Sequence, residues 1–76
     1  MTQNSNIRQR IGQVVRALRK SKELSQADLG KIAYCHRNTI SSLELGKCSE
    51  LTFLEHLADI FGVKLSDIFK MSEDLA

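Results

Sequence analysis

Cysteine and histidine are the residues of this sequence whose types first suggest chemistry. Cys35 and Cys48 lie 13 positions apart, and the histidines are His36 and His56. Zinc sites normally use closely spaced ligand pairs such as CxxC or HxxxH, which these four residues do not form. Cys35 and His36 are adjacent in a predicted turn and have no third group to orient them for catalysis. We therefore expect two free thiols, no metal, no cofactor and no enzymatic activity, unless a low thiol pKa gives Cys35 a redox role.

A second group of polar candidates consists of Arg37, Asn38, Ser41 and Ser42. Ile40 and Leu43 must face a core, and the helical period of about 3.6 residues then turns the four polar side chains outward. Arginine can hydrogen-bond guanine O6 and N7, and asparagine can hydrogen-bond adenine N6 and N7. The pattern fits side chains that contact base edges in DNA, and the alternative is a solvated polar face.

The spacing of apolar residues predicts five helices that would position these side chains. The expected spans are residues 7–21, 26–33 and 37–45, a fourth helix from Thr52 to Gly62 and a short fifth helix capped by Ser66. Asn6 and Ser25 are the predicted N-caps of the first two helices, with Asp28 completing a capping box at Ser25. Thr52 and Glu55 predict a second capping box. Helices this short must pack on one another, so we expect an all-α fold.

The apolar stripes also predict which residues form the core. Gly46 is expected just beyond the third helix, where a left-handed residue is common. The expected core residues are Ile7, Ile11, Val14, Val15 and Leu18, then Leu29, Ile32 and Ala33, then Ile40 and Leu43, then Phe53, Leu54, Leu57, Ala58 and Phe61, and finally Ile68.

Length and charge restrict the class of protein. The chain has 76 residues, enough for one domain, which we expect to have its core within residues 7–69 and an acidic, frayed tail over 71–76. Residues 1–47 carry a net charge of +6 and residues 48–76 a net charge of −4, so one end of the molecule can face a polyanion. Apolar runs are far shorter than the roughly 20 residues that span a membrane, and the N-terminus lacks a secretory signal pattern, so we expect a cytoplasmic protein.

Three motifs resemble the lambda-repressor and Cro family of regulators, also called XRE-like. They are LRKSKELSQADL at 18–29, TISSLELGK at 39–47 and LADIFGV at 57–63. The resemblance covers Ile7 to Phe69 and implies a five-helix fold with a helix-turn-helix motif. It also implies a transcriptional regulator, in which the helix over 37–45 enters the major groove of double-stranded DNA.

The resemblance assigns roles to individual residues of this chain. Base contacts fall on Arg37, Asn38 and Ser42, with Ser41 on the same outward side. An ion pair between Arg19 and Glu44 is implied to hold the recognition helix, although Arg19 could instead contact phosphate. Phosphate contacts fall on Ser25 and Gln26 at a helix N-terminus, with Thr39, Arg16, Lys22 and Lys47 as further candidates.

Two positions depart from the family pattern. Tyr34 stands in the turn where relatives often have glycine, because that turn tends to need a positive φ. Packing is the expected role of its side chain, with a phosphate contact as the alternative. Glu50 lies in the loop after the recognition helix, and its negative charge argues against contacts between this loop and the minor groove of DNA.

A protein of this size reads only a few base pairs, so a homodimer on an inverted repeat is expected. Leu65, Phe69 and Met71 are the candidate dimer residues, although Phe69 could instead complete the monomer core. Restriction-modification controllers, small phage regulators and antitoxins are relatives of similar length, and the sequence does not choose among them. The rival interpretation is a protein-interaction module, and we expect neither a membrane nor a small-molecule partner.

Overall fold

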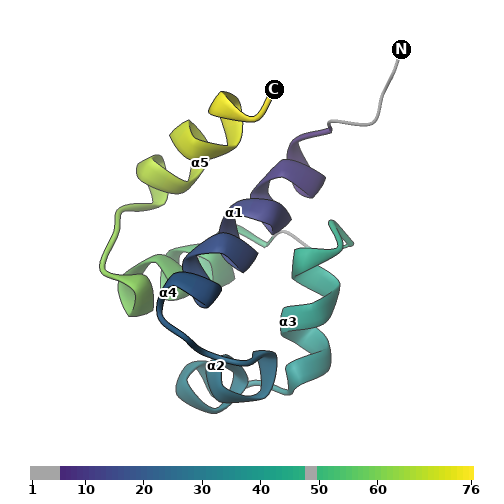
Figure 1. The fold of residues 1–76 in the computed structure, drawn as a ribbon, viewed down its shortest axis with the longest axis vertical. Coiled ribbons are helices and arrows are strands. Elements are labelled where there is room, and N and C mark those ends of the chain that lie inside the picture. The colour runs from purple at the N-terminus through teal and green to yellow at the C-terminus, as the bar shows by residue number, and fades with distance from the viewer. Residues whose placement is uncertain (1–5, 48–49) are drawn as a thin grey trace.

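Five helices form the fold in the computed structural model, which describes residues 6–47 and 50–76. In chain order they are α1 (Ile7–Ser21), α2 (Gln26–Ala33), α3 (Arg37–Glu44), α4 (Leu51–Phe61) and α5 (Leu65–Asp74). α1 crosses the middle of the molecule and packs against both α5 and α3, α2 packs against α3 and α4, and α4 packs against α5 (Figure 1). The expected all-α fold with five helices is confirmed. None of these described helices is long and apolar enough to cross a membrane.

Most helix ends follow the expected local chemistry. The Asn6 side chain accepts a hydrogen bond from the Gln9 N–H at 2.9 Å and caps α1. Ser25 and Asp28 form the predicted reciprocal capping box of α2, with bonds of 2.9 and 3.0 Å. Gly62 ends α4 in the left-handed conformation with φ +74°. Each N-cap gives a partner to one of the N–H groups that a helix start leaves free, and Gly62 allows the chain to turn after α4.

The starts of α4 and α5 differ from the prediction. α4 begins one residue earlier, and the Thr52 hydroxyl donates to the Glu50 carboxylate at 3.1 Å instead of capping the helix. α5 begins at Leu65, so Ser66 lies inside the helix, and the Asp67 carboxylate accepts the N–H of Lys64 at 2.9 Å. An acceptor on the third helical residue can stabilise a helix start without a serine or threonine cap.

The C-terminal helix is also longer than predicted. α5 has ten residues and continues to Asp74, so the segment after Met71 that was expected to fray is helical in the structure. Ser72 is completely buried, and its hydroxyl donates to the carbonyl of Phe69 at 2.7 Å. The Arg10 side chain donates to the Ser72 carbonyl at 3.0 Å, which ties the end of α5 to α1. A polar serine can be buried here because its hydroxyl has a partner within its own helix.

The core contains the predicted apolar stripes of all five helices. Two predicted core residues, Ile7 and Ile32, are instead 45% and 46% exposed. Ile7 lies in the first turn of α1, and Ile32 lies on a side of α2 that neither α3 nor α4 covers. The buried apolar residues are Ile11, Val14, Val15, Leu29, Ala33, Ile40, Leu43, Leu54, Leu57, Ala58, Phe61 and Ile68.

A glycine sets the distance between α1 and α3. A Cβ atom at Gly12 would lie 2.6 Å from the carbonyl oxygen of Leu43 and 2.5 Å from that of Glu44. These are backbone atoms at the end of α3 and cannot move aside as a flexible side chain can. The absence of a side chain at Gly12 therefore allows the last turn of α3 to lie directly on α1.

Candidate nucleic-acid interface

α2 and α3 form a helix-turn-helix unit with a connection of three residues, Tyr34, Cys35 and His36. Tyr34 has φ +60° and ψ +43°, the left-handed conformation expected at this position of the turn. The N–H of Cys35 donates to the carbonyl of Gly30 at 2.8 Å, which closes the turn. Tyr34 is 93% exposed, so the expected packing role of its side chain is wrong.

His36 caps the start of α3, a role that the sequence analysis missed. Its Nδ1 accepts the N–H of Asn38 at 3.0 Å. Nδ1 must therefore be unprotonated in this arrangement, with the ring proton on Nε2. Histidine is not a common N-cap, which is why the pattern of residue types gave no signal. The cap holds the first turn of α3, where Arg37 and Asn38 are both exposed.

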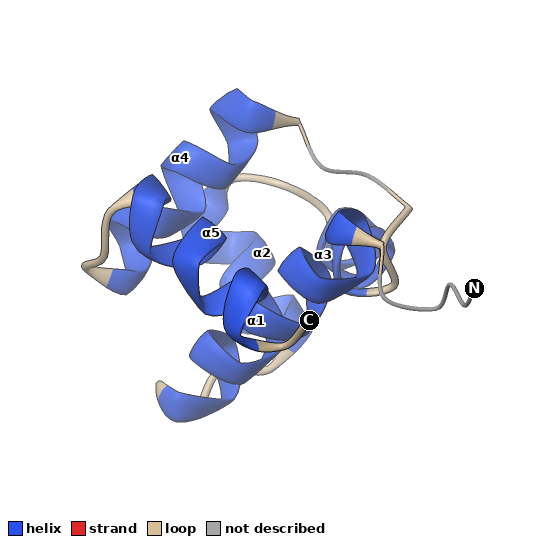
Figure 2. Cartoon of the chain, turned by 90° about the horizontal axis from the view of Figure 1, so that it is seen from above, coloured by secondary structure: helices blue, strands red, loops and turns tan. Residues whose placement is uncertain are grey.

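α3 lies at the edge of the helical cluster, on the opposite side of the molecule from the α4–α5 connection (Figure 2). Ile40 and Leu43 point inward and are completely buried. Arg37 and Asn38 are exposed, whereas Ser41 and Ser42 are half-buried. Thr39 is also half-buried, and its N–H donates to the carbonyl of His36 at 2.9 Å. The polar groups with most access to a partner are therefore at the N-terminal end of α3.

A small polar cleft lies where α1, α2 and α3 meet. Arg16 contributes from α1, Gln26 from the start of α2, and Ser41 from the middle of α3. Three residues expected to contact DNA are thus brought together from separate helices. Ser42 does not line this cleft. Ser41 consequently lies closer to the candidate phosphate-binding residues than the sequence pattern indicated.

Arg19 and Glu44 form an ion pair at the side of this cleft. The Arg19 Nε and Nη2 groups donate to the two Glu44 carboxylate oxygens at 2.7 and 3.1 Å. The Arg19 and Glu44 side chains are only 9% and 4% exposed. Hydrogen bonding of Arg19 to the Glu44 carboxylate raises the pKa of Arg19, and the charge of Glu44 adds to this, whereas burial opposes it. Arg19 therefore stays charged at neutral pH although it is buried.

Two further hydrogen bonds extend this ion pair into a network. Arg19 Nη1 donates to the carbonyl of Leu24 at 2.8 Å, and the Gln26 amide donates to Glu44 at 3.1 Å. The network joins the end of α1, the start of α2 and the end of α3. The Gln26 side chain is therefore already engaged with Glu44, so its backbone N–H is the group available to a phosphate. Sequence analysis identified the pair but not the contribution of Gln26.

The start of α2 has the features of an anion site. Ser25 uses its hydroxyl in the capping box, which leaves the first-turn N–H groups of Gln26 and Ala27 without intrahelical partners. Such groups and the helix dipole favour a negatively charged ligand. The exposed cations Arg16, Lys22 and Lys47 come from α1, its C-cap and the residue after Gly46.

Cys35 does not have the properties of a reactive thiol. It is a free cysteine, half-buried in the turn, and burial raises the pKa of its thiol. A reactive thiolate requires a lowered pKa, so this observation argues against the redox alternative. In residues 6–47 and 50–76 no group of three or more histidine, cysteine or acidic side chains could hold a metal ion. Cys48 lies outside the described residues.

The three candidate dimer residues all contact the core. Leu65, Phe69 and Met71 are half-buried and pack against the central apolar cluster. Their contacts with the core explain in part why these residues are apolar. For Phe69 this agrees with the alternative expectation that it completes the monomer core. Met71 also lines an apolar groove between α1 and α5.

Comparisons with known proteins agree with this geometry. The profile of a family described as "Helix-turn-helix domain" matches residues 10–68, and the chain belongs to this family. In helix-turn-helix domains that bind DNA, the second helix of the motif enters the major groove. A search of curated proteins by sequence finds no match.

Two crystal structures of the clp gene regulator ClgR from Corynebacterium glutamicum share the fold. One has a TM-score of 0.84 and 18% sequence identity, and the alignment covers 92% of each chain. The other has a TM-score of 0.85 and 18% identity, and the alignment covers 92% of this chain and 76% of that chain. At this level of identity the likeness concerns the fold alone.

Proposed function

We propose that the protein is a transcriptional regulator of the lambda-repressor and Cro type, which binds a specific sequence of double-stranded DNA. The observation that carries the proposal is the capped N-terminal end of α3, where Arg37 and Asn38 are exposed about one turn before Ser41, which lines the polar cleft. A protein-interaction module would more naturally expose apolar residues on this side. The structures of ClgR are those of a gene regulator, which is consistent with this function.

In this proposal, α3 lies in the major groove and its exposed residues select bases. Arg37 hydrogen-bonds a guanine and Asn38 an adenine, with Ser42 and Ser41 nearer the groove edge. The start of α2 at Ser25 and Gln26 contacts a phosphate through the N–H groups of Gln26 and Ala27, because the Ser25 N–H already donates to Asp28. Further phosphate contacts come from Thr39, Arg16, Lys22 and Lys47, and together they set the orientation of the domain. The ion pair between Arg19 and Glu44 acts indirectly, because it holds α3 against α1 and α2.

The molecule measures 37 × 23 × 23 Å, so a single copy spans one half-site. Half-sites one helical turn apart are separated by about 34–36 Å along DNA, a spacing that two copies side by side can cover. We therefore propose a homodimer on an inverted repeat.

Selection from a random pool of duplex DNA at near-physiological salt tests the function. We expect an enriched inverted repeat, and we expect Arg37→Ala to lose roughly 1–3 kcal/mol on it and to accept other bases at one position per half-site. Lys70→Ala, at an exposed position on α5, is the control, and this variant should select the same DNA sequence as the wild type. Retention of DNA without enrichment would mean charge-driven binding only, and no retention would favour the interaction module.

A further inference from the structure

His36 supplies two hydrogen-bond acceptors to the first turn of α3. Its Nδ1 accepts the N–H of Asn38 at 3.0 Å, and its backbone carbonyl accepts the N–H of Thr39 at 2.9 Å. α3 has only eight residues, and a helix this short depends strongly on the contacts at its ends. The turn that carries Arg37 and Asn38 is therefore held in part by one ring nitrogen.

The cap requires an unprotonated Nδ1, because the nitrogen must keep its lone pair to accept a hydrogen bond. Protonation of the ring would place an N–H group against the N–H of Asn38, so this bond would be lost. It would also add a positive charge at the positive end of the helix dipole, beside the exposed guanidinium of Arg37. Both effects act against the first turn of α3.

The surroundings of His36 offer little negative charge to balance a protonated ring. The turn adds the titratable groups of Tyr34 and Cys35, which carry no negative charge near neutral pH. Among residues 6–47 and 50–76, the ion pair is that of Arg19 with Glu44, and it does not include His36. The main contacts of α3 are with α1 and α2, whose charged side chains are Arg8, Arg10, Arg16, Arg19, Lys20, Asp28 and Lys31.

Asp28 is the one carboxylate on α1 and α2, and it already accepts the Ser25 N–H at 3.0 Å at the other end of α2. The remaining charged groups of both helices are cations. A proton on His36 would thus join an excess of positive charge, which favours the neutral ring that caps α3.

We propose that neutral His36 is a positioning residue for the recognition of bases, and that its protonation lowers the preference of the protein for its specific DNA site. The ring acts through the N–H of Asn38, which fixes the turn from which Arg37 and Asn38 reach the bases. Histidine ordinarily changes its charge between about pH 5 and 8, so the effect falls in that range. The inference rests on the proposed function, because it concerns the side chains that select bases.

The sign of the pH effect separates this role from a simple effect of charge. Acid adds positive charge to the protein, which strengthens its attraction to the phosphates of any DNA sequence. Loss of the cap acts on the complex in which Arg37 and Asn38 must be placed against particular bases. The ratio of specific to non-specific affinity should therefore fall in acid, whereas added charge alone would leave this ratio nearly unchanged.

His56 provides a matched control near the same turn. Its Nε2 donates to the carbonyl of Ala33, at the end of α2, over a distance of 3.3 Å. A positive charge is favourable at a helix C-terminus, so protonation of His56 does not oppose this contact. His56→Gln removes a titrating ring and leaves the His36 cap unchanged, so this variant should keep the pH dependence of the wild type.

Affinities of the full chain for the selected duplex and for a duplex of scrambled sequence, at about pH 7.5 and about pH 5.5 and constant ionic strength, test the proposal. For the wild type and for His56→Gln we expect the ratio of the two affinities to fall roughly 2- to 30-fold in acid, the factor that corresponds to the loss of one N-cap. Circular dichroism checks that each protein is folded at both pH values.

Two substitutions of His36 distinguish its two ring nitrogens. In His36→Asn the amide Oδ1 takes the position of Nδ1 and caps the helix without titrating, so the ratio should stay high at both pH values. In His36→Gln the amide lies at the position of Nε2 and cannot replace Nδ1, so the ratio should be low at both pH values.

Three results would overturn the proposal. They are a wild-type ratio that does not fall in acid, a His36→Asn ratio that falls as in the wild type, and a His36→Gln ratio that stays high, since Nε2 would then act by contacting DNA. Failure of the proposed function is distinguishable, because the wild type would then show no preference for any DNA sequence at about pH 7.5, where the cap is intact.

Discussion

Tyr34 combines an unfavourable backbone conformation with a side chain that contacts almost nothing. Its φ of +60° lies in the left-handed region, which costs a residue with a Cβ roughly 1–2 kcal/mol. The side chain is 93% exposed, so packing does not compensate for this cost. A left-handed residue is needed here because the chain must turn between α2 and α3 within three residues.

We expect Tyr34→Gly to stabilise the protein by about 1 kcal/mol, because glycine adopts this conformation without steric cost. In a domain of this size the melting temperature would rise by roughly 4–8 °C. Tyr34→Ala keeps the Cβ and should change the stability little. Destabilisation by Tyr34→Gly in thermal unfolding would show that the tyrosine ring makes a contact that its exposure does not reveal.

Asp28 makes the stability depend on acid pH. Its hydrogen bonds with the Ser25 N–H and hydroxyl lower the pKa of this carboxyl below its ordinary value, which is about 3.9. The carboxylate therefore contributes stability above about pH 4, and this contribution is lost as the pH falls through the lowered pKa.

Denaturant unfolding between pH 2 and 7 checks this expectation. Asp28→Asn should be less stable than the wild type at pH 7, and the difference should shrink in acid. Asp59→Asn, at an exposed position on α4, is the matched control. A difference that stays constant down to pH 2 would contradict the proposed role of the carboxylate charge.

At the scale of helices, two contacts decide where α3 lies. One is the close approach at Gly12, and the other is the network around Glu44. Both act on the last turn of α3, whereas the residues that contact bases in the proposal lie at its first turn. A change in either contact would therefore tilt the whole helix, including Arg37.

Gly12→Ala should destabilise the protein by roughly 1–3 kcal/mol or more, because the added methyl group meets carbonyl oxygens of α3. Alanine normally favours a helix over glycine, so the expected sign is opposite to that of helix propensity. Gln13→Ala, at the next and exposed position, is the control and should have little effect. Equal or higher stability of Gly12→Ala would mean that α3 can shift without cost.

Glu44→Ala should cost about 3–5 kcal/mol, because it leaves the buried Arg19 charge without its partner. Arg19 cannot escape this cost by losing its proton, since the guanidinium of arginine stays protonated in proteins. Glu55→Ala, at an exposed acidic residue of α4, is the control for loss of a carboxylate. An unchanged melting temperature for Glu44→Ala would contradict a stabilising role of the pair.

At the scale of the whole molecule, charge is divided between two ends of the chain. The basic residues Arg16, Lys22, Arg37 and Lys47 belong to the helices and loops of the helix-turn-helix half, whereas α4 and α5 carry most of the acidic side chains. The molecule should therefore approach DNA with α3 first and keep α4 and α5 away from the phosphates.

The dependence of DNA-binding affinity on salt concentration tests this orientation. Lys47→Ala should reduce the slope of log K against log salt by about 1, the value for one lost phosphate contact, and weaken binding to all sequences alike. Lys70→Ala, at an exposed position on α5, should leave the slope unchanged. Equal effects of the two variants on the slope would mean that charge acts without a fixed orientation.

Local patterns determined much of this protein before any tertiary contact. The helical period of apolar residues predicted five helices, and Asn6, Ser25 and Gly62 marked helix ends, because these signals act within a few residues of one another. The motifs that resemble the lambda-repressor family also identified the turn position of Tyr34 and the candidate residues of α3. Which bases the exposed side chains contact stays a prediction.

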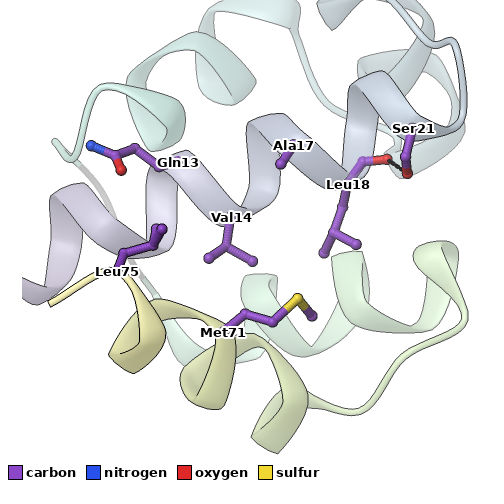
Figure 3. Close-up of a pocket in the computed structure, with 7 residues that line it drawn as sticks. All are labelled: Gln13, Val14, Ala17, Leu18, Ser21, Met71 and Leu75. Atoms are coloured by element: carbon purple, nitrogen blue, oxygen red, sulfur yellow. Dashed lines mark hydrogen bonds between the residues drawn. The ribbon is translucent and has the colours of Figure 1, made fainter.

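Tertiary structure decided the features that depend on distant parts of the chain. Arg10 is 62 positions away from Ser72 in sequence, yet its side chain donates to the Ser72 carbonyl near the end of α5. The exposure of Ile32 depends on which helices cover α2, and the engagement of Gln26 with Glu44 depends on how α2 and α3 meet. The groove between α1 and α5 is lined by residues of two helices that are far apart in the sequence and meet only in the folded structure (Figure 3). Residue types alone could not show these contacts, since each requires the relative positions of whole helices.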